Sequence, residues 1–220
     1  MTARETASPM EKKTEAPWLS LIGIGDDGIE GIGKSAREAI SHAEMFIGGG
    51  RPLAFLPKDG RPRIPWPAPL QDLIDQIPGY RGKKLCVLAT GDPFFFGIGA
   101  LLAEKVPIEE MKVYPAPSSF NLALSRLGWS PPGVRAVSLH GRPLRSLLPH
   151  LMDKARLAIL TANRDSPREI AGLLEAEGFG GSILHVFSHL GGKDETHVTL
   201  TARELASAQP DDRIRDLNIV

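Results

Sequence analysis

Cysteine and unbalanced charge are both missing from this sequence. It has 220 residues and one cysteine, Cys86, which excludes an internal disulfide framework and a zinc site built from several cysteines. The 26 basic and 26 acidic residues cancel, which argues against a general nucleic-acid binder. No apolar run approaches the roughly 18 residues of a membrane span, and residues 1–17 have no apolar segment like that of a secretory signal. We therefore expect a cytoplasmic protein with no nucleic-acid or membrane partner.

Motifs for several common chemistries are also missing. There is no Gly-x-Ser-x-Gly elbow of a hydrolase and no Walker loop for nucleotide phosphates. His185 and His189 are four residues apart, but they fall on and after a predicted strand, so the spacing of metal ligands on a helix does not apply. We expect no metal site, and we expect Cys86 to be packed in the core.

Glycine and proline, by contrast, are abundant, with 23 and 19 residues. Average usage of the two together is roughly 12%, so the chain has many turns and loops. Short apolar runs, such as residues 85–89 and 157–160, alternate along the chain with amphipathic stretches such as residues 119–126. This alternation is typical of an α/β protein, and it predicts parallel sheets covered by helices.

Two prolines, Pro115 and Pro117, interrupt the alternation near the middle of the chain. The length also allows two small domains as well as one large domain. We therefore predict two small α/β/α domains, an N-terminal one at residues 18–114 and a C-terminal one at residues 115–220. Residues 1–17 mix charged residues, Thr, Ala and Pro without periodicity and predict a disordered tail.

Several local expectations follow from the residues alone. Asp92 and Pro93 predict a helix start, with Asp92 as N-cap and Pro93 at the first helical position. Helices are expected at residues 70–77 and 144–154. Residues 217–220 read as the beginning of a strand, which leaves open that the sequence is a piece of a longer protein.

The first loop that follows a predicted strand is Gly23-Ile24-Gly25-Asp26-Asp27-Gly28. It matches the G-x-G-x-x-G pattern of dinucleotide-binding proteins. That fingerprint also requires an acidic residue at the end of the next strand, where this chain has Gly48-Gly49-Gly50-Arg51. The pattern therefore favours a glycine turn over an NAD(P) site. Asp26 and Asp27 are candidates for handling a proton or for capping the loop.

Two further loops carry polar groups at strand ends, where open α/β sheets bind ligands. In Thr90-Gly91-Asp92-Pro93, the glycine lets the backbone approach a ligand and the aspartate supplies a negative charge, which suits a cationic ligand. In Pro115-Ala116-Pro117-Ser118-Ser119, two hydroxyl groups stand at the start of a predicted helix. They can contact a small polar ligand or serve only as a helix cap.

The motifs also follow one another in a specific order. After the first glycine loop come the Gly-Asp-Pro loop with its aromatic continuation, Pro-x-x-Ser-Ser, a strand that ends in threonine, and a glycine turn. In this sequence the last four are Gly91–Gly97, Pro115–Ser119, Leu160-Thr161 and Ser188–Glu195. This order resembles the tetrapyrrole methylase family, and the resemblance covers roughly residues 18–220.

The resemblance implies two α/β domains with S-adenosyl-L-methionine bound in the cleft between them and S-adenosyl-L-homocysteine as product. Most members have Gly-Pro-Gly in the first loop, where this chain has Gly25-Asp26-Asp27-Gly28. A sulfonium cation near Asp92 is electrostatically sensible. Carried over by motif, the cofactor-binding residues are Gly25, Thr90, Gly91, Asp92, Ser118, Ser119, Thr161 and Leu190.

The resemblance also implies a substrate, a reduced tetrapyrrole with many carboxylates. The planar fork of arginine suits carboxylates. Arg51, Arg142 and Arg145 fall near predicted strand ends or loops, and Arg142 is the first choice for substrate binding, together with Arg51. Each also has the plainer interpretation of a solvated surface residue. Because the macrocycle supplies the carbon nucleophile, we assign no catalytic general base.

The first loop, Gly48–Leu53 and Ser138–Arg142 are like those of family members that methylate carbon 5 of precorrin-6Y in cobalamin biosynthesis. The resemblance therefore implies a methyltransferase acting at that carbon and a homodimer. It leaves open a fused or separate domain that methylates carbon 15 and decarboxylates. Three alternatives remain: another methylase of the family, a non-catalytic tetrapyrrole-binding domain, and an NAD(P)-dependent oxidoreductase.

Overall fold

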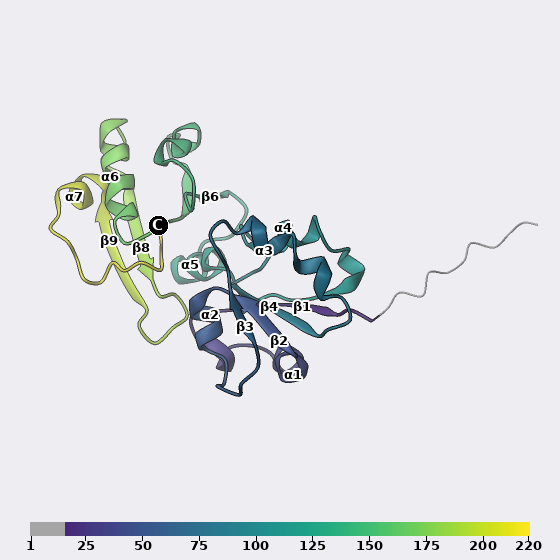
Figure 1. Ribbon diagram of the computed structural model, residues 1–220. Coiled ribbons are helices and arrows are strands. Elements are labelled where there is room, and N and C mark those ends of the chain that lie inside the picture. Colours follow the sequence, from purple (N-terminus) through teal and green to yellow (C-terminus); the bar gives the residue numbers. More distant parts are fainter. Residues whose placement is uncertain (1–15) are drawn as a thin grey trace, which may run out of the picture.

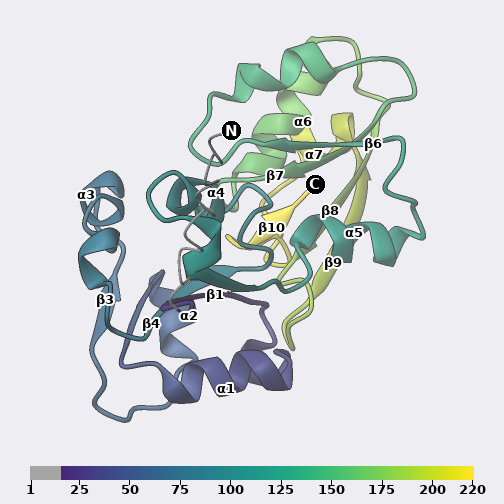
Figure 2. The ribbon, with the colours of Figure 1, turned by 90° about the vertical axis from the view of Figure 1, so that its right-hand side faces the viewer.

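Ten strands form two five-stranded sheets in the computed structural model, which describes residues 16–220. Residues 19–114 supply every strand of one sheet, and residues 134–219 supply every strand of the other. The two units lie side by side (Figure 1), and a quarter turn places the first sheet below the second (Figure 2). Most of the predicted tail, residues 1–15, lies outside the described residues. The α/β class is confirmed; the exact domain boundaries stay a proposal that the separate sheets support.

The first sheet is built from the short apolar runs of the first half of the chain. Its strands are β1 (Leu19–Ile24), β2 (Met45–Gly48), β3 (Arg63–Pro65), β4 (Leu85–Thr90) and β5 (Met111–Tyr114). They are parallel and lie in the spatial order β3-β2-β4-β1-β5. Leu21 pairs with Val87 on one side and Val113 on the other, so β1 is buried between two strands. Continuous apolar runs are typical of strands covered on both faces.

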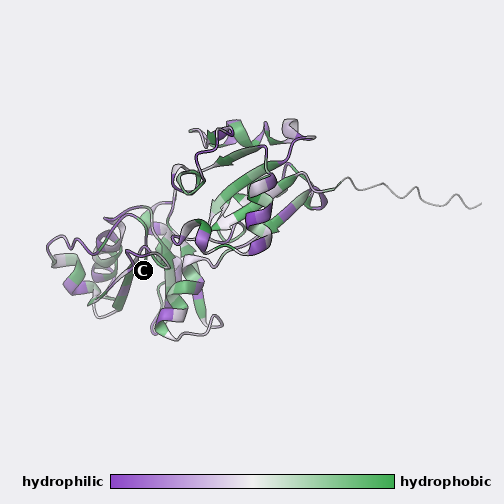
Figure 3. Cartoon of the chain, turned by 90° about the horizontal axis from the view of Figure 1, so that it is seen from below, coloured by the Kyte–Doolittle hydropathy of each residue, from purple (hydrophilic) through white to green (hydrophobic). Residues whose placement is uncertain are grey.

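Helices cover both faces of the first sheet. They are η1 (Gly28–Glu30), α1 (Lys34–His42), α2 (Gly50–Ala54), α3 (Gln71–Ile74), η2 (Ile77–Tyr80), α4 (Ile98–Ala103) and η3 (Ile108–Glu110). Leu102 of α4 packs with Leu21 on one face, while Ile40 of α1 packs with Ile22 and Cys86 on the other. The strands are largely hydrophobic and the helices carry hydrophilic stretches (Figure 3). Cys86 is fully buried, as predicted.

The second sheet is mixed. Its strands are β6 (Val134–Ser138), β7 (Arg156–Leu160), β8 (Ile183–Ser188), β9 (Thr196–Thr201) and β10 (Asn218–Ile219), in the order β6-β7-β10-β8-β9. Its helices are α5 (Ser119–Leu127), η4 (Leu144–His150), α6 (Ser166–Ala176) and α7 (Ala202–Ser207). Phe120 of α5 packs on one face with Phe187, and Ile170 of α6 packs on the other with Val186. Within the described residues, no helix is long and apolar enough to cross a membrane.

The prediction of parallel pairing is wrong for most of the second sheet. Only β6 and β7 run parallel. β8 and β9 pair antiparallel because the short turn at residues 189–195 joins them directly, and parallel neighbours need a longer crossover. β10 inserts antiparallel between β7 and β8, where Ile219 pairs with Leu160 and Phe187.

Three predicted helices also differ from the structure. Asp92 is not an N-cap: α4 begins only at Ile98, and the Asp92 carboxylate accepts a hydrogen bond from the Phe94 N–H at 2.8 Å, which stabilises a turn instead. The helix expected at residues 144–154 is the 3₁₀ helix η4, which contains Pro149 and therefore lacks one backbone donor. The helix expected at residues 70–77 is split into the short α3 and η2.

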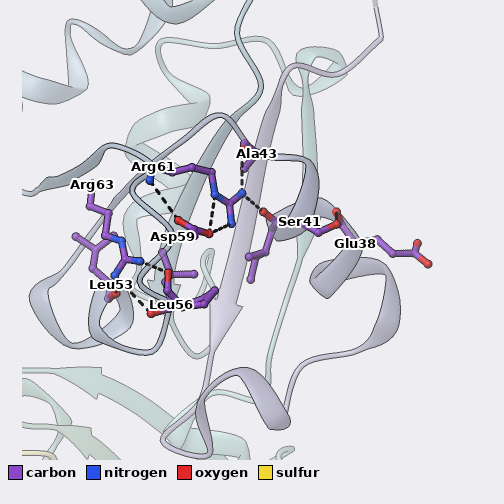
Figure 4. A network of polar contacts seen from close by, with 10 residues as sticks. Glu38, Ser41, Ala43, Leu53, Leu56, Asp59, Arg61 and Arg63 are labelled. Atoms are coloured by element: carbon purple, nitrogen blue, oxygen red, sulfur yellow. Dashed lines mark hydrogen bonds and ion pairs between the residues drawn. The ribbon is translucent and has the colours of Figure 1, made fainter.

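The proline-rich segment before β3 is held to the sheet edge by two arginines (Figure 4). The Arg61 guanidinium donates to the backbone oxygens of Ile40 and Ala43, at 2.7 Å each, and to the Asp59 carboxylate. Arg63 donates to the backbone oxygen of Leu53. These side chains supply polar contacts that the prolines cannot, so an irregular segment can end in an edge strand.

Candidate functional site

A cavity of about 570 Å³ lies between the two sheets. Small-molecule sites span about 300–1,000 Å³. The cavity lies at the carboxyl ends of β1 and β4, where parallel α/β sheets bind ligands. All eight residues that the resemblance assigns to the cofactor line it: Gly25, Thr90, Gly91, Asp92, Ser118, Ser119, Thr161 and Leu190. The structure thus brings distant motifs together in one place, and their contact with a cofactor stays a proposal.

Two glycines let three loops meet at this cavity. A Cβ atom on Gly23 would lie 1.9 Å from the Gly91 carbonyl oxygen and 2.7 Å from the Ala116 backbone nitrogen. Gly91 has a φ of +64°, and a Cβ atom there would lie 3.3 Å from Cα of Ser118. A side chain at either position would push apart the segments that follow β1, β4 and β5. Close backbone packing therefore shapes this wall.

The polar groups of this wall come from Asp92 and the start of α5. Asp92 is half-buried beside the cavity. Ser118 is 4% exposed, and its hydroxyl oxygen accepts a hydrogen bond from the Asn121 N–H at 3.2 Å, which makes it the N-cap of α5. A carboxylate next to a capped helix start can hold the positive and negative groups of a zwitterion together.

The opposite wall comes from the second sheet. Leu190 is buried there, and the Thr161 hydroxyl lies 2.7 Å from the backbone oxygen of Asn218 and 2.6 Å from its side-chain oxygen. The sequence prediction missed Asn218 and Phe187, although both line the cavity. No local motif marks them; their place depends on the insertion of β10 between β7 and β8.

The three candidate arginines occupy different positions. Arg51 lines the cavity, and its guanidinium donates to the Asp26 carboxylate. The Arg142 guanidinium lies 6.0 Å from the centre of the Phe96 ring, and Phe96 lines the cavity, so Arg142 stands at the rim. Arg145 is exposed on η4 and does not line the cavity. Arg51 and Arg142 are thus positioned to reach a ligand that extends beyond the cavity.

The turn between β8 and β9, residues 189–195, is fastened to α5. The Arg126 guanidinium donates to both carboxylate oxygens of Glu195, at 2.6 and 2.8 Å. Glu195 also accepts the Gly191 N–H at 2.7 Å. The Arg126 guanidinium is the main cause that lowers the pKa of Glu195. These contacts fix the turn that carries Leu190 into the cavity.

Two α/β units around a ligand-sized cavity define a protein that binds a small molecule between two sheets. Residues 19–206 match the tetrapyrrole (corrin/porphyrin) methylases, and the chain belongs to this family. Methylases of this family use S-adenosylmethionine. The sequence prediction of the family is confirmed.

Relatives and a solved structure agree with this assignment. The chain is 43% identical over 197 residues to a precorrin-6Y C(5,15)-methyltransferase (decarboxylating) of Sinorhizobium sp., covering 89% of this chain and 48% of that protein. It is 33% identical over 177 residues to a cobalt-precorrin-7 C(5)-methyltransferase of Salmonella typhimurium, covering 80% and 87%. The crystal structure of a precorrin-6Y methylase from Archaeoglobus fulgidus superposes with a TM-score of 0.65 at 27% identity, covering 93% and 96%. The chain thus spans about half the length of the Sinorhizobium relative.

Proposed function

We propose that this chain transfers a methyl group from S-adenosylmethionine to carbon 5 of a corrin precursor of the precorrin-6Y type, in cobalamin biosynthesis. One observation carries the proposal: the eight motif residues share one cavity in a chain that is 43% identical to a precorrin-6Y methyltransferase. The relative from Salmonella typhimurium, whose name specifies carbon 5 alone, aligns over 87% of its own length. This supports carbon 5 as the position methylated.

The cavity fits S-adenosylmethionine in its chemistry. The cofactor has an amino-acid zwitterion, a sulfonium cation and an apolar adenine ring. Asp92 supplies a negative charge, and the start of α5 with Ser118 and Ser119 supplies hydrogen-bonding groups for a carboxylate. The apolar side chains of Leu190 and Phe187 supply contact for a ring.

The chain's own residues align the two reactants and exclude water. When bound, S-adenosylmethionine supplies an electrophilic methyl carbon. In the transfer, the sulfur–methyl bond breaks, a bond forms between the methyl group and carbon 5, and the macrocycle loses one proton to solvent or to its own nitrogens. Alignment in a closed cavity accounts for most of the acceleration of such a displacement. Arg142, at the rim beside Phe96, holds a peripheral carboxylate of the macrocycle, and Arg51 assists from the opposite unit.

The dinucleotide alternative has no support in the geometry. The helix that should follow the glycine loop directly, α1, begins only at Lys34. Its start is therefore displaced from Gly23–Gly28, and β2 is followed by Gly49, Gly50 and Arg51 without a carboxylate. Another methylase of the family and a domain that only binds the tetrapyrrole remain distinguishable by experiment.

Two measurements test the proposal. Calorimetry with S-adenosylmethionine, S-adenosylhomocysteine and NADPH is expected to show binding of the first two only. Incubation with precorrin-6Y and S-adenosylmethionine is expected to give a product heavier by one methyl group, with the new carbon assigned to position 5 by NMR. Binding without turnover would favour a binding domain, and a methyl group at another carbon would favour another methylase.

Three finer features rest on the family resemblance. We propose that the chain acts as a homodimer in the cytoplasm and works with a fused or separate domain that methylates carbon 15 and decarboxylates. The name of the Sinorhizobium relative describes such a double activity. Light scattering tests the dimer, and the product of the chain alone, compared with that of the longer relative, tests the division of labour.

A further inference from the structure

Asp26 connects the two units of the molecule. It follows β1, and one of its carboxylate oxygens accepts a hydrogen bond from the Arg51 guanidinium. The other oxygen lies 2.9 Å from Nδ1 of His189, which follows β8 in the second sheet. The turn between β8 and β9 extends to the first unit beside α2 (Figure 1). The Asp26 side chain is only 11% exposed, so this contact is largely shielded from water.

The contact leaves no spare room around the carboxylate. A Cβ atom on Gly192 would lie 2.5 Å from the His189-facing oxygen of Asp26, so the turn packs directly on that carboxylate. His189 itself has a φ of +53°. A left-handed conformation costs a residue other than glycine about 1 kcal/mol. The backbone of His189 is held in this conformation by hydrogen bonds with Leu217 and Gly192. Strain of this kind is tolerated where the side chain must point in one direction.

Both residues of this contact are next to the walls of the cavity. Gly25, which precedes Asp26, lines the cavity from the first unit, and Leu190, which follows His189, lines it from the second. The polypeptide itself crosses between the sheets at residues 115–118. The Asp26–His189 contact is therefore a further attachment between the units, placed where two facing walls of the cavity begin.

We propose that Asp26 and His189 are positioning residues that set the separation of Gly25 and Leu190, and hence the fit of the cofactor in the cavity. Arg51 fixes the carboxylate from its own unit. An aspartate with both oxygens engaged holds neighbouring groups and is not free to accept a proton from the substrate. The consequence for the methyl donor rests on the function proposed above; the consequence for the spacing of the two units does not.

Cofactor affinity tests the first consequence. Asp26→Asn and His189→Gln are each expected to weaken binding of S-adenosylhomocysteine about tenfold in calorimetry, the effect of losing one charge-assisted hydrogen bond. The double variant is expected to be no weaker than either single one, because both remove the same contact. His189→Arg keeps a cationic donor and is expected to recover most of the affinity. Asp194→Asn, exposed on the same turn, serves as the matched control and is expected to bind normally.

The spacing of the units tests the second consequence without any cofactor. Because Cys86 is buried, spin labels can be placed on Lys34→Cys in α1 and Ile183→Cys in β8, whose side chains are exposed. Asp26→Asn is expected to broaden the distance distribution between them, and His189→Arg is expected to keep it narrow. An unchanged distribution in Asp26→Asn, or additive affinity losses in the double variant, would overturn this proposal. Failure of the wild type to bind S-adenosylhomocysteine would instead overturn the proposed function.

Discussion

Glu195 accepts two parallel hydrogen bonds from Arg126, with Nε at 2.6 Å and Nη2 at 2.8 Å, across 69 residues of sequence. A paired fork of this kind fixes both direction and distance. It joins the first helix after the crossover between the sheets to the turn that enters the cavity. The pair is partly exposed, so its value for stability is modest and depends on pH.

We expect Glu195→Gln to lower the free energy of unfolding by about 0.2–1 kcal/mol at pH 7. Arg126 holds the pKa of Glu195 below its ordinary value of 4.5 in the folded state. The stabilisation is therefore complete above that value and is lost as the pH falls through the lowered pKa. Urea unfolding at pH 7 and in the acidic range measures the difference between wild type and variant, which is expected to shrink in acid.

The matched control is Glu175→Gln, which breaks a more exposed ion pair with Arg203. It is expected to have the smaller effect at pH 7. A difference between wild type and Glu195→Gln that grows as the pH falls would contradict the role given to this pair.

Gly91→Ala is expected to destabilise the protein by about 1–3 kcal/mol, because the new methyl group meets Ser118 and the backbone is left-handed. Gly128→Ala is the control: Gly128 has the same φ of +64° but open space around it. Denaturant unfolding is expected to show the larger loss for Gly91→Ala, and only that variant is expected to lose cofactor affinity. Equal losses in both measurements would mean that conformation alone, without contact, matters at position 91.

Asp92→Asn is expected to weaken binding of S-adenosylmethionine about tenfold, because the side chain loses its charge but keeps the oxygen that accepts the Phe94 N–H. S-adenosylhomocysteine has a neutral sulfur and is expected to lose less. Parallel calorimetric titrations with the two ligands measure the contrast. Equal losses for both would place Asp92 against a part of the cofactor that the two share, and no loss would remove it from the site.

Arg142→Ala is expected to raise the KM for the macrocycle about tenfold, the cost of one charged hydrogen bond, while leaving affinity for S-adenosylmethionine unchanged. Arg145→Ala, exposed on η4, provides the control and is expected to behave as wild type in both. Steady-state kinetics with each substrate varied in turn separates the two constants. A change confined to the cofactor would show that Arg142 is placed wrongly.

Cys86 is expected to be unreactive toward thiol reagents in the folded protein. Burial raises the pKa of its thiol to about 12, and its side chain has no exposed surface. A colorimetric thiol assay is expected to give a signal only after denaturant is added. Rapid labelling under native conditions would mean that β4 opens readily.

The sequence contained enough local information to predict the strands of both sheets, because apolar runs such as Leu85–Ala89 become buried strands. It also located all eight candidate cofactor residues, since each lies in a short motif at a strand end. It did not reveal Asn218 or the partner of Asp26. The Asp26–His189 contact joins residues 163 apart and depends on how the two sheets pack, which no local pattern encodes.

The place of β10 has a consequence for folding during synthesis. β6 and β7, and likewise β8 and β9, find their partners among neighbouring strands of the chain, but the gap between these two pairs is filled only by Asn218 and Ile219. The first sheet is complete about a hundred residues earlier, at β5. A ribosome therefore releases a finished first unit long before the second sheet can close. Until then, the edges of β7 and β8 stay open to wrong partners, so this step is where misfolding is expected to begin.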